Sequence, residues 1–119
     1  MRPFSISTAV ILAAASALSH AGLCDSVEET DRLIQCLGGE NTKADALLNA
    51  EYSRLRGRLS PERRDQLREA QRAWIVFRDK DCEFEASAAA GGQAYEPLYV
   101  SCQTDKTMRR IKELKGQGS

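Results

Sequence analysis

Apolar side chains recur at helical spacing along most of the chain. Three stripes carry the pattern: Leu48, Tyr52, Leu55 and Leu59; Leu67, Ala70, Trp74 and Phe77; and Met108, Ile111 and Leu114. A spacing of three or four residues is typical of amphipathic helices, whereas a half-buried strand would alternate apolar and polar residues. Continuous alternation is absent from the sequence. The pattern predicts a single all-α domain, a small bundle that is monomeric or weakly dimeric.

Capping and breaking residues set the expected ends of these helices. The sequence predicts three or four helices, over residues 27–37, 43–59 and 61–89 and from residue 105 onward. The expected N-caps are Ser26, Asn41 or Thr42, Ser60 and Thr104, and the expected stops are the Gly38-Gly39 and Gly91-Gly92 pairs. Pro61 directly follows Ser60, and proline is favoured at the first position of a helix.

Residues 91–103 are expected to form the one long irregular segment. It carries Tyr95, Leu98 and Tyr99, and tyrosine is enriched at protein interfaces. This segment is therefore our candidate for partner binding. The alternative is that its tyrosines simply pack against the core.

The N-terminus has the composition of an export signal. Arg2 precedes a short apolar run, and small residues at Ser19 and Ala21 fit cleavage after Ala21. The run is too short to favour an uncleaved membrane anchor, and leucine directly before Cys24 does not fit a lipid-attachment motif. The sequence thus predicts a signal peptide over residues 1–21, a mature domain over residues 22–119 without a membrane span, and a periplasmic or secreted location.

Charge and cysteine content narrow the class of protein further. The chain has 17 basic and 17 acidic residues, and removal of residues 1–21 also removes His20, its single histidine. Such a balance argues against a nucleic-acid partner. Four cysteines in a small exported chain indicate a disulfide framework. Antiparallel packing of the last two helices would join Cys82 to Cys102 and leave Cys24 with Cys36, a pairing we favour over the other two.

Arg78 lies on the expected packing face of the long helix. At 100° per residue it shares that face with Gln71, Trp74 and Cys82. A buried guanidinium needs a partner, and Asp45 on the preceding helix is the first choice, because Asp79 points about 100° away. This polar pair would set helix register, and loss of Asp45 would cost about 3 kcal/mol by stranding the charge. The functional alternative is an anion-binding or catalytic arginine.

Catalytic and metal-binding groups are scarce. Without a mature histidine the usual general base and the commonest metal ligand are missing, and disulfides would occupy the thiols. The carboxylates of Asp79, Asp81, Glu83 and Glu85 splay around a helix and form neither a calcium loop nor an acid–base pair. The sequence therefore predicts a protein that is not an enzyme and has no metal, cofactor or catalytic residue.

Charge is distributed unevenly along the mature chain. Residues 22–51 hold seven acidic and two basic side chains, whereas residues 54–72 hold seven arginines and three acids. A solvated surface explains much of this. The acidic part could instead steer a basic protein such as a lysozyme, and the arginine-rich part could bind anionic polymer or lipid.

Four segments together resemble the LprI-like lysozyme-inhibitor domain family. They are "CDSVEETDRLIQC", "ADALLNAEY", "LREAQRAWIVFRDKDC" and "SCQTDKTMRRIKEL", in that order. The matching positions are Asp45, Leu48, Asn49 and Tyr52; Gln71, Trp74, Arg78, Asp79 and Cys82; and Cys102, Thr107, Arg110 and Leu114. The resemblance implies a helical domain, with Asn49, Tyr52, Gln71 and Trp74 as core signature residues, and for some members inhibition of lysozyme. The partner it implies is a lysozyme or another envelope protein.

Overall fold

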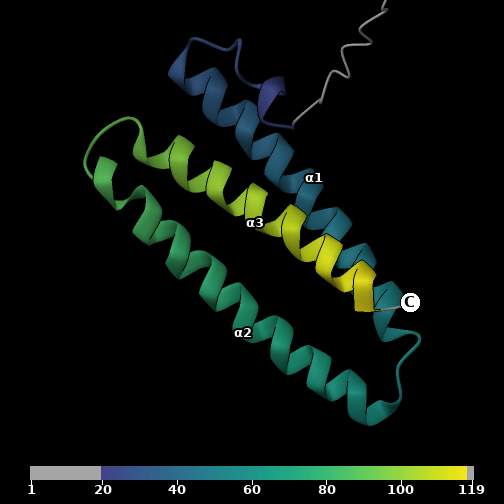
Figure 1. Ribbon diagram of the computed structural model, residues 1–119. Coiled ribbons are helices and arrows are strands. Elements are labelled where there is room, and N and C mark those ends of the chain that lie inside the picture. Colours follow the sequence, from purple (N-terminus) through teal and green to yellow (C-terminus); the bar gives the residue numbers. More distant parts are fainter. Residues whose placement is uncertain (1–19, 118–119) are drawn as a thin grey trace, which may run out of the picture.

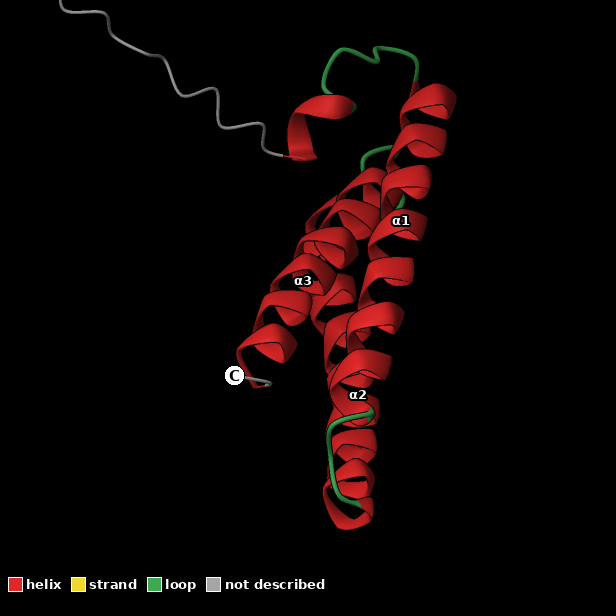
Figure 2. Ribbon diagram, turned by 90° about the vertical axis from the view of Figure 1, so that its right-hand side faces the viewer, coloured by secondary structure: helices red, strands yellow, loops and turns green. Residues whose placement is uncertain are grey.

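Three long helices make up the domain. The computed structural model describes residues 20–117, so the expected signal peptide lies almost entirely outside the described residues. The helices are α1 (Thr30–Arg56), α2 (Pro61–Ala86) and α3 (Tyr95–Gln117), with short 3₁₀ turns η1 (His20–Leu23) and η2 (Ser87–Ala89). In Figures 1 and 2, α1 and α2 run antiparallel, and α3 returns along both of them. The all-α prediction is confirmed.

Helix α1 passes through the glycine pair that was expected to end it. The predicted break at Gly38-Gly39 and the short helix over residues 27–37 are therefore wrong: one helix runs to Arg56, and its N-cap is Glu29 rather than Ser26. Thr42 does not cap a second helix, because its hydroxyl donates to the Gly38 carbonyl inside α1, at 3.0 Å. Each glycine costs a helix about 1 kcal/mol, which packing of the whole helix can override.

The start of α2 follows the sequence prediction. Ser60 caps it and accepts a hydrogen bond from the Arg63 amide, at 3.4 Å, and Pro61 is the first helical residue. The α-helix gives way to η2 at Ser87. Gly91 then reverses the chain with a φ of +80°, a conformation that favours glycine. The Ser60 cap is confirmed, whereas α2 ends at Ala86, before the predicted end near Ala89, and Gly91 follows the η2 turn.

Helix α3 begins nine residues before its predicted cap. Residues 95–103 are helical, so the expected irregular segment shrinks to the short turn before Tyr95. Pro97 is compatible with this start because the first turn of a helix needs no backbone N–H donors. Thr104 is not an N-cap, since its hydroxyl donates back to the Val100 carbonyl, at 3.0 Å. The proline and the glycines before it concealed the first turns of the helix.

The apolar core lies where α3 packs against α1. It consists of Leu48, Leu55, Ile111 and Leu114, with partly buried side chains around it: Tyr52, Leu59, Leu67, Trp74 and Met108. Two residues predicted on the buried face of α2 are exposed, Ala70 and Phe77, the latter at 59%. The packing face of α2 is instead centred on Gln71 and Cys82, so Phe77 lies to one side of it. Asn49 is also exposed, which makes its assignment to the core wrong.

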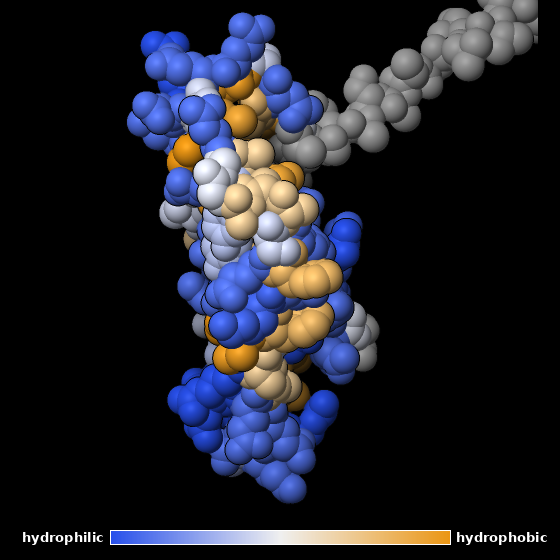
Figure 3. Space-filling view, turned by 90° about the vertical axis from the view of Figure 1, so that its left-hand side faces the viewer, coloured by the Kyte–Doolittle hydropathy of each residue, from blue (hydrophilic) through white to orange (hydrophobic). Residues whose placement is uncertain are grey.

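One face of α2 leaves apolar side chains in contact with solvent. Val76, Phe77 and Phe84 are all largely exposed there. Figure 3 shows apolar residues reaching the surface along the middle of the molecule, above a lower end covered by hydrophilic residues. The arginine-rich start of α2 forms that lower end.

Two disulfides hold the ends of the helices, and both predicted pairings are confirmed. Cys24 joins Cys36 across 5.9 Å between Cα atoms, so the segment before α1 folds back onto the helix. Cys82 on α2 joins Cys102 on α3 across 5.6 Å. Within residues 20–117, no helix is long and apolar enough to cross a membrane.

Candidate functional site

The middle of the bundle contains a polar network around Arg78. Its guanidinium donates from Nε to Asp79 Oδ1 at 2.9 Å and from Nη1 to Thr107 Oγ1 at 3.3 Å, and Nη1 lies 3.6 Å from Asp45 Oδ1. The Arg78 side chain is 13% exposed, and Thr107 is fully buried. One arginine thus ties α2 to both neighbouring helices.

Two details of this network differ from the sequence interpretation. Asp79 was expected to point away, yet its carboxylate is the nearer of the two acids, because a flexible side chain can bend back along its own helix. Asp45 is 48% exposed and therefore is not on the buried stripe. With two carboxylates and a hydroxyl around it, Arg78 has little capacity left to bind an external anion.

Trp74 lies between two guanidinium groups. The Arg78 guanidinium carbon is 5.3 Å from the ring centroid, and that of Arg110 is 5.7 Å away. Arg110 also donates from Nε to Gln71 Oε1, at 3.0 Å, which satisfies a buried amide. These contacts hold Trp74 and Gln71 between α2 and α3, and the indole face is occupied from within the protein rather than open to a ligand.

The tyrosines proposed for partner binding are partly buried and make contacts within the bundle. Tyr95 and Tyr99 stack with ring centroids 6.1 Å apart, and the Tyr99 hydroxyl accepts a hydrogen bond from Gln103 Nε2 at 2.8 Å. Gln103 Nε2 is also 2.8 Å from Asp79 Oδ1 on α2. Burial, and next the negative charge of Asp79, raise the pKa of the Tyr99 phenol. Leu98 points elsewhere and is 49% exposed.

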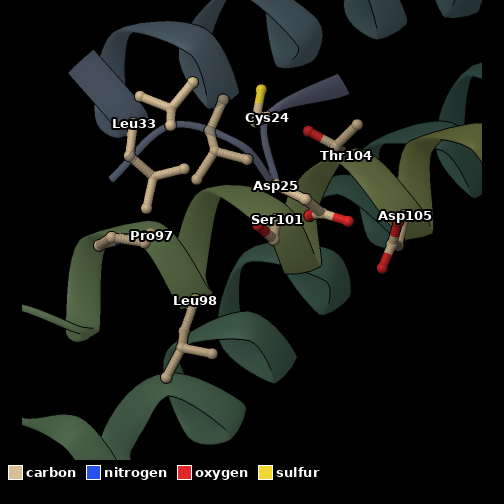
Figure 4. A pocket seen from close by; sticks show the side chains of 10 residues that line it. Cys24, Asp25, Leu33, Pro97, Leu98, Ser101, Thr104 and Asp105 are labelled. Atoms are coloured by element: carbon tan, nitrogen blue, oxygen red, sulfur yellow. The ribbon is translucent and has the colours of Figure 1, made fainter. Parts of the chain in front are cut away.

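A cleft lies where the N-terminal segment meets α3. Its volume is about 360 Å³, and its lining is drawn from the segment before α1, the first turns of α1, and α3. The apolar part consists of Val27, Leu33, Leu37, Pro97 and Leu98, and the polar part of Asp25, Ser101, Thr104 and Asp105, with Cys24 completing the wall. In Figure 4 the Leu33 and Pro97 side chains lie on one side, and Asp25, Thr104 and Asp105 on the other.

The cleft brings together two features that were separate in the sequence. The acidic N-terminal segment contributes Asp25, and the proposed recognition segment contributes Leu98. Sequence reasoning missed Asp105 and Ser101, because they were expected in a helix or loop remote from residue 25. The Cys24–Cys36 pairing was the one signal that pointed to this end, since it folds the N-terminal segment back.

A second hollow, of about 290 Å³, lies near the start of α2. Arg63, Gln66 and Leu67 line it from α2, and Arg110 and Gln117 from α3. Arginines surround this end of the molecule, although some are paired within the helices: Arg68 lies 3.1 Å from Asp65, and Arg54 pairs with Glu51. The arginine-rich end and the acidic cleft are therefore at opposite ends of the bundle (Figure 1).

Neither a metal-binding cluster nor a free thiol is present in the described part of the chain. Residues 20–117 contain no group of three or more histidine, cysteine or acidic side chains placed to hold a metal ion. All four cysteines are disulfide-bonded, so none offers a thiolate nucleophile.

Comparison with known proteins decides the family. The model of the family described as lysozyme inhibitor LprI matches residues 24–114. The chain belongs to the LprI lysozyme-inhibitor family. It is also similar to an uncharacterized protein of Rhizobium meliloti (strain 1021), with 46% identity over 52 residues. That match covers 43% of this chain and 37% of the relative, so the chain spans little more than a third of that protein. No solved structure matches the chain.

Proposed function

We propose that this LprI-family chain is an exported envelope protein, periplasmic or secreted, that binds a lysozyme and inhibits it by covering the enzyme's cleft. The family match over residues 24–114 carries the proposal, because it spans all three helices of the domain. An inhibitor of this kind needs no catalytic groups, only a surface that fits the enzyme.

Rigidity of the scaffold supports such a role. The Cys82–Cys102 disulfide and the Arg78–Thr107 hydrogen bond tie α3 to α2, and the ion pair of Arg78 with Asp45 ties α2 to α1. The Cys24–Cys36 disulfide holds the N-terminal segment on α1. A surface that is already ordered loses little conformational entropy on binding, and this improves affinity without additional contacts. The acidic segment beside the cleft adds a long-range attraction for a basic enzyme, which raises the association rate.

The test is a titration of the mature chain, residues 22–119 with both disulfides intact, against several lysozymes. Cell-wall lysis measures inhibition, and calorimetry measures complex formation directly. We expect inhibition that matches the binding curve and weakens as salt screens the charges. Neither inhibition nor a complex with any lysozyme at micromolar concentrations would contradict the proposal.

A second function is favoured by the arginine-rich end. Residues 54–72 carry seven arginines, which could bind an anionic polymer or lipid of the envelope. Such binding would be measured with polyphosphate and with vesicles of anionic phospholipid, and it would fall steeply with salt. Strong binding to either probe together with no effect on any lysozyme would favour this second function.

A further inference from the structure

We infer that the cleft between the N-terminal segment and α3 receives the side chain of a lysine or arginine from the partner protein. The inference rests on the proposed function, since it names the group that the lysozyme would contribute. The cleft is near the lower end of the range of small-ligand pockets, about 300–1,000 Å³, and so suits one long side chain with its flanking backbone.

The walls of the cleft match the two chemical halves of such a side chain. Leu33, Leu37 and Pro97 offer an apolar surface to the methylene stem. Asp25 and Asp105 lie on the polar side with the Ser101 hydroxyl, where they can accept hydrogen bonds from an ammonium or guanidinium group. Long cationic side chains bind in this divided way because the stem is apolar and the head group is charged.

Asp25 and Asp105 are the two acids that line the cleft, and they differ from acids elsewhere on α2 that are neutralised by ion pairs. Asp79 and Asp81 both pair with cations, Arg78 and Lys106, on α2 or α3. Within residues 20–117, the carboxylates of Asp25 and Asp105 form no ion pair and no side-chain hydrogen bond. Asp105 also lines a small adjoining hollow with Lys106 and Arg109, but the lining of the cleft itself includes two carboxylates and no cation, next to an apolar wall.

The shape of the cleft is set before any partner arrives. The Cys24–Cys36 disulfide holds Asp25 beside α1. The Cys82–Cys102 disulfide anchors α3 to α2 at a point on the helix between Leu98 and Asp105. Leu98 is 49% exposed at the edge of the cleft, where contact with the partner's surface would cover it. A single cationic anchor in this pocket would fix the orientation of the two proteins.

The first arm of the experiment compares two variants with the same change in net charge. The double variant Asp25→Asn/Asp105→Asn removes the charge of the cleft, and Glu62→Gln/Glu69→Gln removes two exposed charges on α2 as a control. Partly exposed ion pairs contribute a few-fold each, so we expect the cleft variant to bind lysozyme about tenfold more weakly than the wild type. The control should bind within about twofold, and circular dichroism with disulfide mapping checks that both variants fold.

The second arm uses small probes and needs no lysozyme. Capped lysine and capped arginine, each as the N-acetyl methylamide, are titrated into the wild-type chain, with capped norleucine as the uncharged control. We expect amide NMR shifts at Leu98 and Ser101 with the two cations, absent with norleucine and absent in the cleft variant.

The outcomes separate the two proposals. Equal lysozyme binding by the wild type and the cleft variant would overturn the inference and leave the inhibitor function intact. If no lysozyme binds the wild type, the inhibitor function fails, and the probes then decide whether the cleft selects cations. Shifts with norleucine as large as those with lysine and arginine would overturn the inference in either case.

Discussion

Replacement of Arg78 by methionine should leave the domain nearly as stable as the wild type, whereas replacement by alanine should not. The Arg78 side chain is 13% exposed, so its methylenes are packed while its charge is shared among three partners. The two substitutions separate these contributions, because methionine keeps most of the apolar stem and alanine removes it.

The charged part of Arg78 contributes little on balance. The cation–π contact with Trp74 and the hydrogen bond to Thr107 each stabilise by about 1 kcal/mol, and the two ion pairs with half-exposed aspartates by about 0.5 kcal/mol each after screening. The cost of burying the guanidinium offsets much of this. We therefore expect Arg78→Met to change the free energy of unfolding by less than about 1 kcal/mol. Arg78→Ala removes two packed methylenes and leaves a cavity, which should cost about 3 kcal/mol.

Urea denaturation with the disulfides intact measures both values, and the exposed Arg72→Met serves as a control expected within about 0.5 kcal/mol of the wild type. A loss as large for Arg78→Met as for Arg78→Ala would show that charge pairing, not packing, holds the helices.

The structure also lowers the expected cost of Asp45→Ala. Asp45 is 48% exposed and Arg78 keeps Asp79, so about 0.5 kcal/mol replaces the 3 kcal/mol expected from sequence.

Three further perturbations test other parts of the fold. Gly38→Ala/Gly39→Ala should raise the free energy of unfolding by about 1 kcal/mol or more, because both glycines are helical and open space surrounds an added Cβ; thermal unfolding measures the gain. Tyr99 should ionise above the ordinary range of a tyrosine, since its pKa is raised, so ultraviolet titration should show a high-pH ionisation that is lost in Tyr99→Phe. The neutral phenol is favoured in the folded state, so this contribution to stability is present below pH 10 and is lost as the pH rises through the folded pKa. Cys82→Ser/Cys102→Ser should cost about 3 kcal/mol in urea denaturation, as expected for a loop of this length.

Helix type was predictable from the sequence, but several helix ends were not. Apolar periodicity and the Ser60 cap act locally, so both could be recognised without knowing which helices pack together. The continuity of α1 through Gly38-Gly39 depends on its contacts with α3, which no local signal reports. The early start of α3 at Tyr95 was concealed for a similar reason, since Pro97 and the preceding glycines usually mark a loop.

The candidate site was predictable only in its parts. Cysteine spacing indicated both disulfides, and the packing face of α2 indicated that Arg78 needed a partner. The cleft could not be foreseen, because it forms between the segment before α1 and a stretch of α3 that was expected to be irregular. Asp25 and Asp105 are far apart in the sequence, and an isolated aspartate carries no signal of a binding site.

The Arg78 network and the cleft are connected through α3. Thr107 and Cys102 fix the middle of that helix to α2, and Asp105 lies between them in the sequence with its side chain at the cleft. A shift of α3 along its axis would therefore move Asp105 relative to Asp25, which the other disulfide holds in place. The buried arginine can thus matter for binding without touching a partner: by fixing the register of α3, it fixes the separation of the two carboxylates that face the cleft. A substitution at Arg78 that leaves stability unchanged but weakens partner binding would be the expected sign of this coupling.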